Sequence, residues 1–223
     1  MRENRFHFDA DYSETATLAD GTQVLLRLVG PADKALLRRA FQDLSTESRY
    51  SRFFTHKAEL SEAELEALTS MDGINQLALG AITFDARREP IPLAVARFVR
   101  VPERPAVADA AVAVVDAFQT RGLGTLMVQR LAAAARERGI VRFSCEFFLR
   151  NEKIRHLIEC MAPMTSYETD GEVAHVEIPV PETEPGASPT QFDRDTPLHQ
   201  LLGHSASGAI QVRLQRAILK LKE

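Results

Sequence analysis

A short turn at residues 119–125, with the sequence QTRGLGT, has the residue types of an anion-binding loop. It separates an apolar stretch from a segment with helical periodicity, which predicts a strand before it and a helix after it. Glycines let the backbone approach a ligand closely, because no Cβ is in the way. The helix start would add unpaired N–H groups and a dipole that attracts anions, and no acid follows Gly124 in its first turn. The turn therefore suits a phosphate or a pyrophosphate.

Two common phosphate-binding loops do not match this turn. A Walker A loop needs Gly-Lys-Ser/Thr, which the sequence lacks. A dinucleotide-binding loop needs a third glycine three positions after Gly124, where Met127 stands instead. The alternative without a ligand is a strand-to-helix connection with incidental glycines.

The segments before the turn predict a hairpin, two helices and three strands. Asp20–Gly21 is typical of a tight hairpin turn between residues 15–18 and 22–29. Pro31 suits the first turn of a helix, and Ser61 with Glu64 forms a capping box at the start of a second one. The first helix would bury Leu36, Leu37, Ala40, Phe41 and Leu44, and the second Leu65 and Leu68. Strands follow at 76–84, 91–101 (closed by Pro102 and Pro105) and 107–115, the last expected to be buried on both faces.

The segments after the turn predict a helix, a strand, a short helix and a final hairpin. The first helix ends at Gly139, with Arg136 and Arg138 in its last turn, where cations favour the helix dipole. A strand at 141–148 and a short helix at 151–160 follow, then a hairpin of 164–168 and 172–180. We expect an N-terminal extension with the first hairpin strand (1–21), one domain (22–181), a proline-containing linker (182–208) and a C-terminal amphipathic helix (209–223).

The composition excludes several classes of protein. The 223 residues carry a net charge of -4, whereas nucleic-acid-binding domains usually have a basic excess. The longest apolar run, 110–115, is far too short to cross a membrane, and the N-terminus has no apolar signal-peptide core. Cys145 and Cys160 do not make a disulfide framework, and the spaced histidines do not predict a metal site. We expect a cytoplasmic protein without nucleic-acid or membrane partners.

The order strand, Gln-x-x-Gly-x-Gly, helix, within this pattern of elements, resembles the GNAT superfamily of N-acetyltransferases. Two further stretches, DGTQVLLRLV at 20–29 and LSTESRYSRFF at 44–54, resemble bacterial protein-lysine acetyltransferase domains. The resemblance covers residues 22–181. It implies an α/β (α+β) fold with a mixed, mostly antiparallel central sheet, helices on both faces, and strands that splay apart at the cofactor site.

The resemblance also implies acetyl-CoA as cosubstrate, inserted where the strand before the turn splays from its neighbour. By position, Val112, Ala113 and Val114 would line the pantetheine arm with their backbone groups. Asn151 matches a position that often contacts the cofactor, although Asn is equally suited to a plain helix cap. The remaining implied cofactor residues are Gln119, Thr120, Arg121, Gly122, Leu123, Gly124 and Thr125, around the pyrophosphate.

Amine acetylation needs a base, because a lysine ammonium with a pKa near 10.4 cannot attack a thioester. Asp109 lies ten residues before Gln119, where the lysine acetyltransferase domains carry Glu, and Glu146 stands where other members carry a catalytic Glu. Asp is one methylene shorter and would need a bridging water, so Glu146 is weighted slightly higher. Without a catalytic role, Asp109 would be an acid at an exposed strand end, and Glu146 would be a salt-bridged acid at the edge of the sheet. The Val114 N–H is the expected donor to the oxyanion.

Other catalytic groups are harder to find. Many members carry a general-acid Tyr where this sequence has Ile158, but a thiol with a pKa near 8.5 already leaves fairly well. No feature marks Cys145 or Cys160 as an activated nucleophile. Three functions stay open: acetylation of protein lysines, acetylation of a small amine, and a non-catalytic acyl-CoA-sensing module. The C-terminal helix is expected to dock on its own domain, with dimerisation or partner binding as the alternative.

Overall fold

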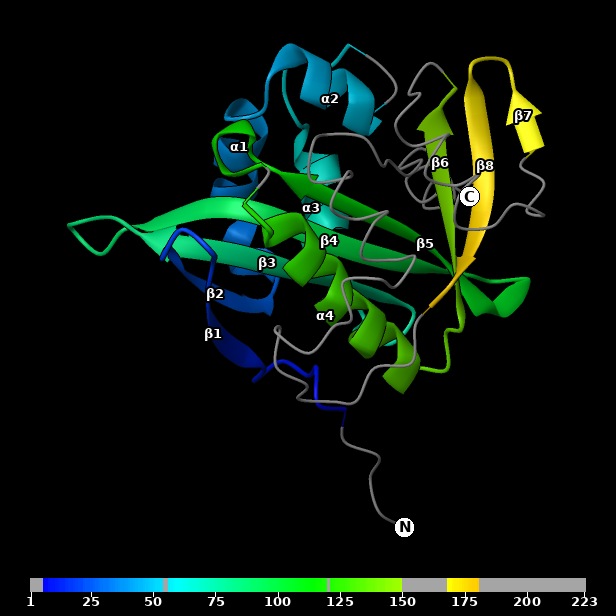
Figure 1. Ribbon diagram of the computed structural model, residues 1–223, viewed down its shortest axis with the longest axis horizontal. Helices are drawn as coiled ribbons and strands as arrows, with labels where there is room; N and C mark the ends of the chain where they lie inside the picture. The colour runs from blue at the N-terminus through cyan, green and yellow to red at the C-terminus, as the bar shows by residue number, and fades with distance from the viewer. Residues whose placement is uncertain (1–5, 54–55, 120, 150–167, 181–223) are drawn as a thin grey trace.

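The structure is a computed structural model that describes residues 6–53, 56–119, 121–149 and 168–180. In this part of the chain, eight strands form a sheet in the order β1-β2-β3-β4-β5-β6-β8-β7 (Figure 1). Every neighbouring pair is antiparallel except β5 and β6, which are parallel. The strands are β1 (Ser13–Thr17), β2 (Gln23–Leu28), β3 (Gln76–Phe84), β4 (Pro90–Val101), β5 (Arg104–Val114), β6 (Arg142–Phe148), β7 (Glu168–Asp170) and β8 (Val173–Pro179).

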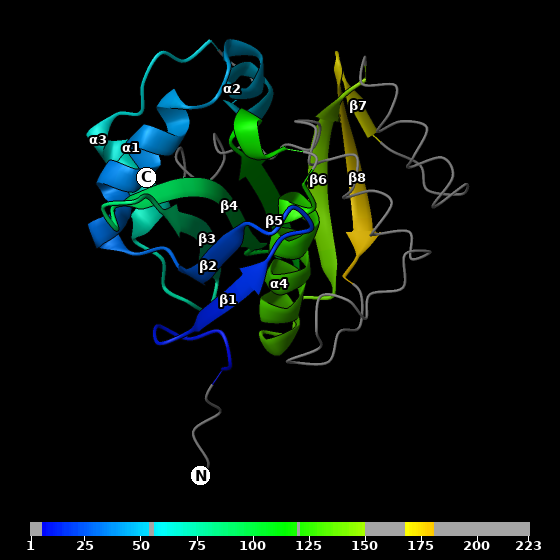
Figure 2. The same ribbon diagram turned by 60° about the vertical axis from the view of Figure 1, so that its left-hand side comes forward.

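Helices cover both faces of the sheet (Figure 2). α4 (Leu123–Glu137) lies on one face, and α1 (Lys34–Gln42) and α3 (Glu62–Thr69) lie on the other. α2 (Thr46–Phe53) lies at one end of the sheet, near β6. Two short 3-10 turns, η1 (Pro31–Asp33) and η2 (Asp116–Phe118), precede α1 and follow β5. The mixed, mostly antiparallel fold predicted from the sequence is confirmed.

Local signals placed several element ends correctly. The capping box is present: Glu64 N–H donates to Ser61 Oγ at 3.3 Å, and Ser61 N–H donates to Glu64 Oε2 at 2.9 Å. Gly139, with a φ of 73°, ends α4 as expected. Its N–H donates to the Arg136 carbonyl and the Ile140 N–H donates to the Ala135 carbonyl, which is a Schellman ending.

Arg138 lies at the end of α4, as expected, but it does more than interact with the helix dipole. Its side chain is buried and donates to the carbonyls of Gly73 at 2.6 Å and Phe8 at 2.7 Å. The guanidinium also lies 4.2 Å from the ring centroid of Phe6. Arg138 therefore joins the end of α4 to two segments that are distant in the sequence.

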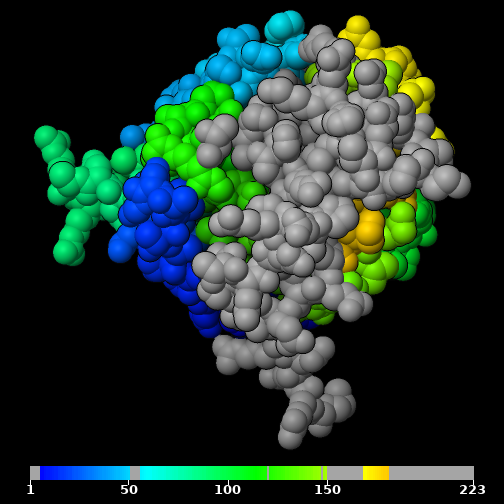
Figure 3. All heavy atoms as spheres, in the orientation of Figure 1, coloured from blue at the N-terminus to red at the C-terminus, as the bar shows by residue number. Residues whose placement is uncertain are grey.

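The other departures from expectation concern prolines and one helix. Pro105 lies inside β5 and does not close β4, because a turn at Pro102 and Glu103 leads directly from one strand into the next. α2 was not expected as a helix. It begins after Ser45, whose Oγ accepts from the Ser48 N–H at 3.1 Å. In Figure 3 the turn between β3 and β4 projects from the body of the molecule.

The main apolar core lies between α4 and the sheet. Leu123, Met127 and Leu131 of α4 are completely buried there against Leu79 of β3 and Phe98 of β4. A second, smaller cluster of Phe41, Leu60 and Leu65 lies under α1 and α3. The short helix expected at 151–160, the linker and the C-terminal helix all lie outside the described residues. In the described part of the chain, no helix is long and apolar enough to cross a membrane.

Candidate active site

The parallel strands β5 and β6 separate along their length. They pair at three positions, Val107 with Arg142, Ala108 with Phe143 and Asp109 with Ser144. Both strands continue, to Val114 and Phe148, but no further pair between them occurs in the described ranges. Val112 and Ala113 are only half-buried, whereas the apolar run predicted burial on both faces.

The backbone of β5 shows which groups face this gap. The Val115 N–H donates to the Leu93 carbonyl of β4 at 2.9 Å. Because backbone groups alternate in direction along a strand, those of Val114 and Val112 point toward the gap and those of Ala113 point toward β4. Ala113 was expected to offer backbone groups to a cofactor, and the register directs them to β4 instead.

The turn after β5 presents backbone N–H groups. Gly122 precedes α4 with a φ of 84°, a conformation that suits glycine. No side chain caps the helix, and the first helical bond runs from the Leu126 N–H to the Gly122 carbonyl at 3.1 Å. The side chains of Leu123 and Thr125 are buried, so residues 123–125 present mainly backbone to the helix start. This arrangement matches an anion site.

Two predicted cofactor residues in the turn have positioning contacts of their own. Gln119 Nε2 donates to the Val114 carbonyl at 3.2 Å and to Asp116 Oδ1 at 2.9 Å. Arg121 donates to Asp20 Oδ2 at 2.8 Å, in the turn of the first hairpin, and lies over the ring of Phe118. Both side chains thus fix the turn. Thr120 and Asn151, also predicted, lie outside the described residues.

The two candidate bases lie on one face of the sheet. Asp109 is the register partner of Ser144, so their side chains share a face, and Glu146 follows Ser144 at the two-residue period of a strand. Glu146 is only 5% exposed, and its Oε1 lies 2.5 Å from His175 Nε2 of β8, its register partner. The structure therefore brings both predicted acids to the same side of the β5–β6 gap.

His175 and Tyr50 belong to this region and were missed in the sequence. Tyr50 of α2 stacks on Phe148, which lies two residues after Glu146 on the same face, with centroids 5.5 Å apart. α2 is held there by Asp116, whose carboxylate accepts from the Ser45 N–H at 2.5 Å and from the Ser48 hydroxyl at 2.7 Å. The stretch LSTESRY thus places the ring of Tyr50 against Phe148, on the strand that carries Glu146. No local pattern reveals these contacts, because they depend on register between distant segments.

Cys145 lies on the opposite face, in the core beneath α4. Burial raises the pKa of its thiol to about 12, and the nearby carboxylates of Asp109 and Glu146 add to the effect. The thiol is therefore protonated at neutral pH and is not a nucleophile. Cys160 lies outside the described residues.

Comparison with known proteins fits this geometry. The profile of the acetyltransferase (GNAT) family matches residues 37–161, more than half of the chain. The GNAT domain of S. lividans PAT is 27% identical, with a TM-score of 0.64 over 77% of this chain and 99% of that one.

Two less similar structures share the fold. A cAMP-binding acyltransferase from Mycobacterium smegmatis is 22% identical with a TM-score of 0.51, and the match covers 93% of this chain but 56% of that one. The Salmonella typhimurium protein yncA, solved with its cofactor acetyl-CoA, is 14% identical with a TM-score of 0.50 over 74% of this chain and 97% of that one. Together with the family match, the strand divergence and the glycine turn, these similarities show that the chain belongs to the GNAT family of acetyltransferases, which use acetyl-CoA.

Proposed function

We propose that the protein transfers an acetyl group from acetyl-CoA to the ε-amine of a protein lysine, by direct attack of the amine on the thioester. The observation that carries this proposal is the β5–β6 gap, with Glu146 and Asp109 on one face beside it. The gap supplies a place for the thioester, and the acids supply a place for the proton.

The pyrophosphate of acetyl-CoA would bind at the start of α4. The backbone N–H groups of residues 123–125 would donate to it, and the helix dipole would add to the attraction. The pantetheine arm would then run along the backbone of Val112 and Val114. In this pose the Val114 N–H, which points into the gap, would donate to the oxyanion as the amine attacks.

Glu146 is the proposed base. Its carboxylate is buried and ion-paired or hydrogen-bonded with His175, which fixes its orientation toward the face where Asp109 lies. It would take a proton from the lysine ammonium, directly or through one water, as the amine enters. Asp109 would assist through a bridging water, because its side chain is shorter. The thiolate of CoA leaves without a strong general acid, since thiols are fairly acidic, and it takes up the second proton that the attacking nitrogen loses.

A protein lysine is favoured over a small amine because two stretches, at 20–29 and 44–54, resemble protein-lysine acetyltransferase domains. The 27% identity with the GNAT domain of S. lividans PAT adds to this support. The test is to incubate the protein with acetyl-CoA and either a protein mixture or a panel of small amines. Acetyl-lysine is read by mass spectrometry and thiol release by a colour reaction. Modified lysines are expected. Turnover with small amines alone would show that the acceptor is a small amine and not a protein lysine. No turnover with either would reject the proposal.

The cofactor pose has a separate test in Gly124→Asp, which places a carboxylate in the first turn of α4. We expect affinity for acetyl-CoA to fall more than about tenfold, because the new charge repels the pyrophosphate. Gly124→Ala is the matched control with the same Cβ and no charge. Equal affinity of the Asp and Ala variants, measured by calorimetry, would contradict the pose.

A further inference from the structure

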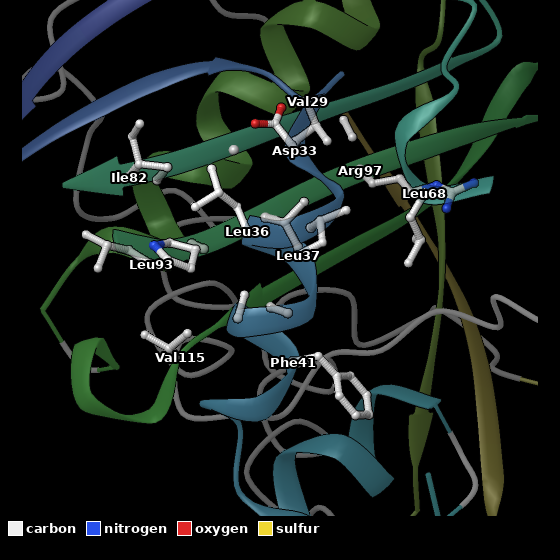
Figure 4. A pocket seen from close by; sticks show the side chains of 18 of the residues that line it. Val29, Asp33, Leu36, Leu37, Phe41, Leu68, Ile82, Leu93, Arg97 and Val115 are labelled. Carbon is white, nitrogen blue, oxygen red and sulfur yellow. The ribbon is translucent and has the colours of Figure 1, made fainter. Parts of the chain in front are cut away.

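A cavity of about 90 Å³ lies between α1, α3 and the face of the sheet opposite α4 (Figure 4). Its walls are mostly aliphatic, with Leu36 and Leu37 from α1 and Leu68 from α3 above the strands. Ala78 of β3 and Val95 of β4 form part of its floor. The cavity is partly open to solvent, because Leu36, Leu37 and Leu68 are only half-buried.

One charged side chain in the wall is not neutralised. Arg97 of β4 is only 5% exposed, and its Nη2 lies 3.4 Å from Gln76 Oε1, at the long limit of a hydrogen bond. Its Nε and Nη1 are buried and have no hydrogen-bond partner among the described residues. Burial lowers the pKa of Arg97 to about 10, so the guanidinium still carries its charge at neutral pH.

The carboxylate that also lines the cavity is already engaged. Asp33 accepts from Arg27 Nη2 at 2.5 Å and Nη1 at 2.7 Å, and from the Gly30 N–H at 2.9 Å. Burial is the one cause that shifts the pKa of Arg97, so no described carboxylate lies close enough to raise it. Arg97 is therefore a buried cation in the wall of an apolar space, with two donors that lack hydrogen-bond partners.

A ligand that matches both features carries one carboxylate and a short alkyl chain. A carboxylate would neutralise the guanidinium and accept from its donors, and an aliphatic chain would fill the cavity. A cavity of about 150 Å³ holds the six carbons of benzene, so this one holds about four carbons. Figure 4 places Arg97 and Leu68 toward one end and Ile82 and Leu93 toward the other.

We propose that this cavity is a binding site for a short-chain carboxylate, with the carboxylate on Arg97 and the chain among the aliphatic side chains. The cavity reaches Ala113 and Val115, on either side of Val114, whose backbone faces the β5–β6 gap. The proposal does not depend on the proposed acceptor. The proposed occupant is a free short-chain acid, because an acyl group bound to CoA as a thioester has no carboxylate to neutralise Arg97.

Butyrate is the probe. At ten times its dissociation constant, it is expected to raise the Tm of the full chain by about 3–6 °C. Acetate, with two fewer methylenes, is expected to bind about 15-fold more weakly, since each buried methylene contributes about a factor of four. NOEs from the butyrate methyl to the methyl groups of Leu37 and Val95 would place it in the cavity. The neutral analogue butyramide is expected to give no shift.

Arg97→Met removes the charge but keeps an apolar side chain of similar length, so the variant should fold. It is expected to lose the butyrate response, whereas Arg97→Lys keeps part of it and the exposed Arg87→Met keeps all of it. Saturating CoA is expected to leave butyrate binding unchanged. No response in the wild type, an unchanged response in Arg97→Met, or displacement of butyrate by CoA would each overturn the proposal.

Discussion

The two faces of the sheet are built differently. Beneath α4, the side chains of Met127, Leu131 and Phe98 are completely buried and apolar, and the charged Arg130 is paired with Glu14. On the other face, the buried Arg97 lies beside the cavity, and the buried Glu146 lies beside the gap between β5 and β6.

This difference separates stability from chemistry within single strands. Successive residues of β4, β5 and β6 contribute alternately to the closed face and to the face with the acids. A substitution on the closed face should therefore change mainly the free energy of unfolding. A substitution beside the gap on the other face should change mainly the rate of the reaction. The following predictions test this separation, beginning with the largest effect.

The largest effect is expected for Glu146→Gln, which removes the proposed base and keeps the shape of the side chain. We expect kcat/KM to fall by about 10²–10⁴ with little change in acetyl-CoA affinity. Its neighbour Cys145 faces the other way, so Cys145→Ala should keep kcat/KM within about twofold and lower only stability. Thiol release and thermal unfolding measure the two quantities. A large loss of activity in Cys145→Ala would contradict the separation of stability and chemistry between the two faces.

In β4, Phe98 and Val95 lie on opposite faces. Phe98→Ala should lower the free energy of unfolding by about 3–5 kcal/mol, because it leaves a cavity in the closed core. Val95→Ala should cost about 1 kcal/mol or less, because Val95 already borders an open space. Urea unfolding of both variants measures the difference, and similar costs would mean that both faces are equally packed.

The ion pair on the α4 face predicts a loss of stability in acid. Burial alone would raise the pKa of Glu14, but hydrogen bonds from Arg130 and Tyr12 outweigh it and hold the pKa below its usual value. The stabilisation is therefore present above the unfolded pKa, about 4.3, and is lost as the pH falls through the lower folded pKa. Glu14→Gln should cost about 1.5–3 kcal/mol at pH 7 and progressively less in acid. An equal cost at pH 7 and pH 3 would contradict the linkage.

The smallest effect is expected at the start of α3, on the face with the cavity. Ser61→Ala removes one half of the capping box and should lower the free energy of unfolding by about 1 kcal/mol. Ser70→Ala, at the other end of α3, is the control and should cost less than about 0.5 kcal/mol. Both variants should retain full activity in the thiol-release assay, since neither contacts the strand gap.

Local signals were enough to predict most of the elements. Ser61, Gly139 and the Asp20–Gly21 turn determine backbone geometry within a few residues, so their effects can be read from the sequence. The apolar runs likewise predicted β3, β4, β5 and β6 within a few residues.

The misses at the candidate site depend on contacts between distant segments, whereas the position of Pro105 and the helix α2 are local features that were not recognised. His175 meets Glu146 only because of the register between β6 and β8, and the backbone direction of Ala113 follows from the register between β4 and β5. The burial of Arg97 runs against the usual placement of arginine. Each of these is a property of the assembled sheet, which the order of residues alone does not display.

The anchoring of Arg138 has a consequence at the opposite end of α4. The helix has 15 residues, so its two ends lie about 22 Å apart. Because Arg138 fastens the last turn to the carbonyls of Gly73 and Phe8, the helix cannot pivot without breaking those bonds. The direction in which its first N–H groups point is thus set during folding, and the pyrophosphate proposed to bind there would meet donors that are already aligned. We expect the precision of this alignment to depend on a residue that never touches the ligand.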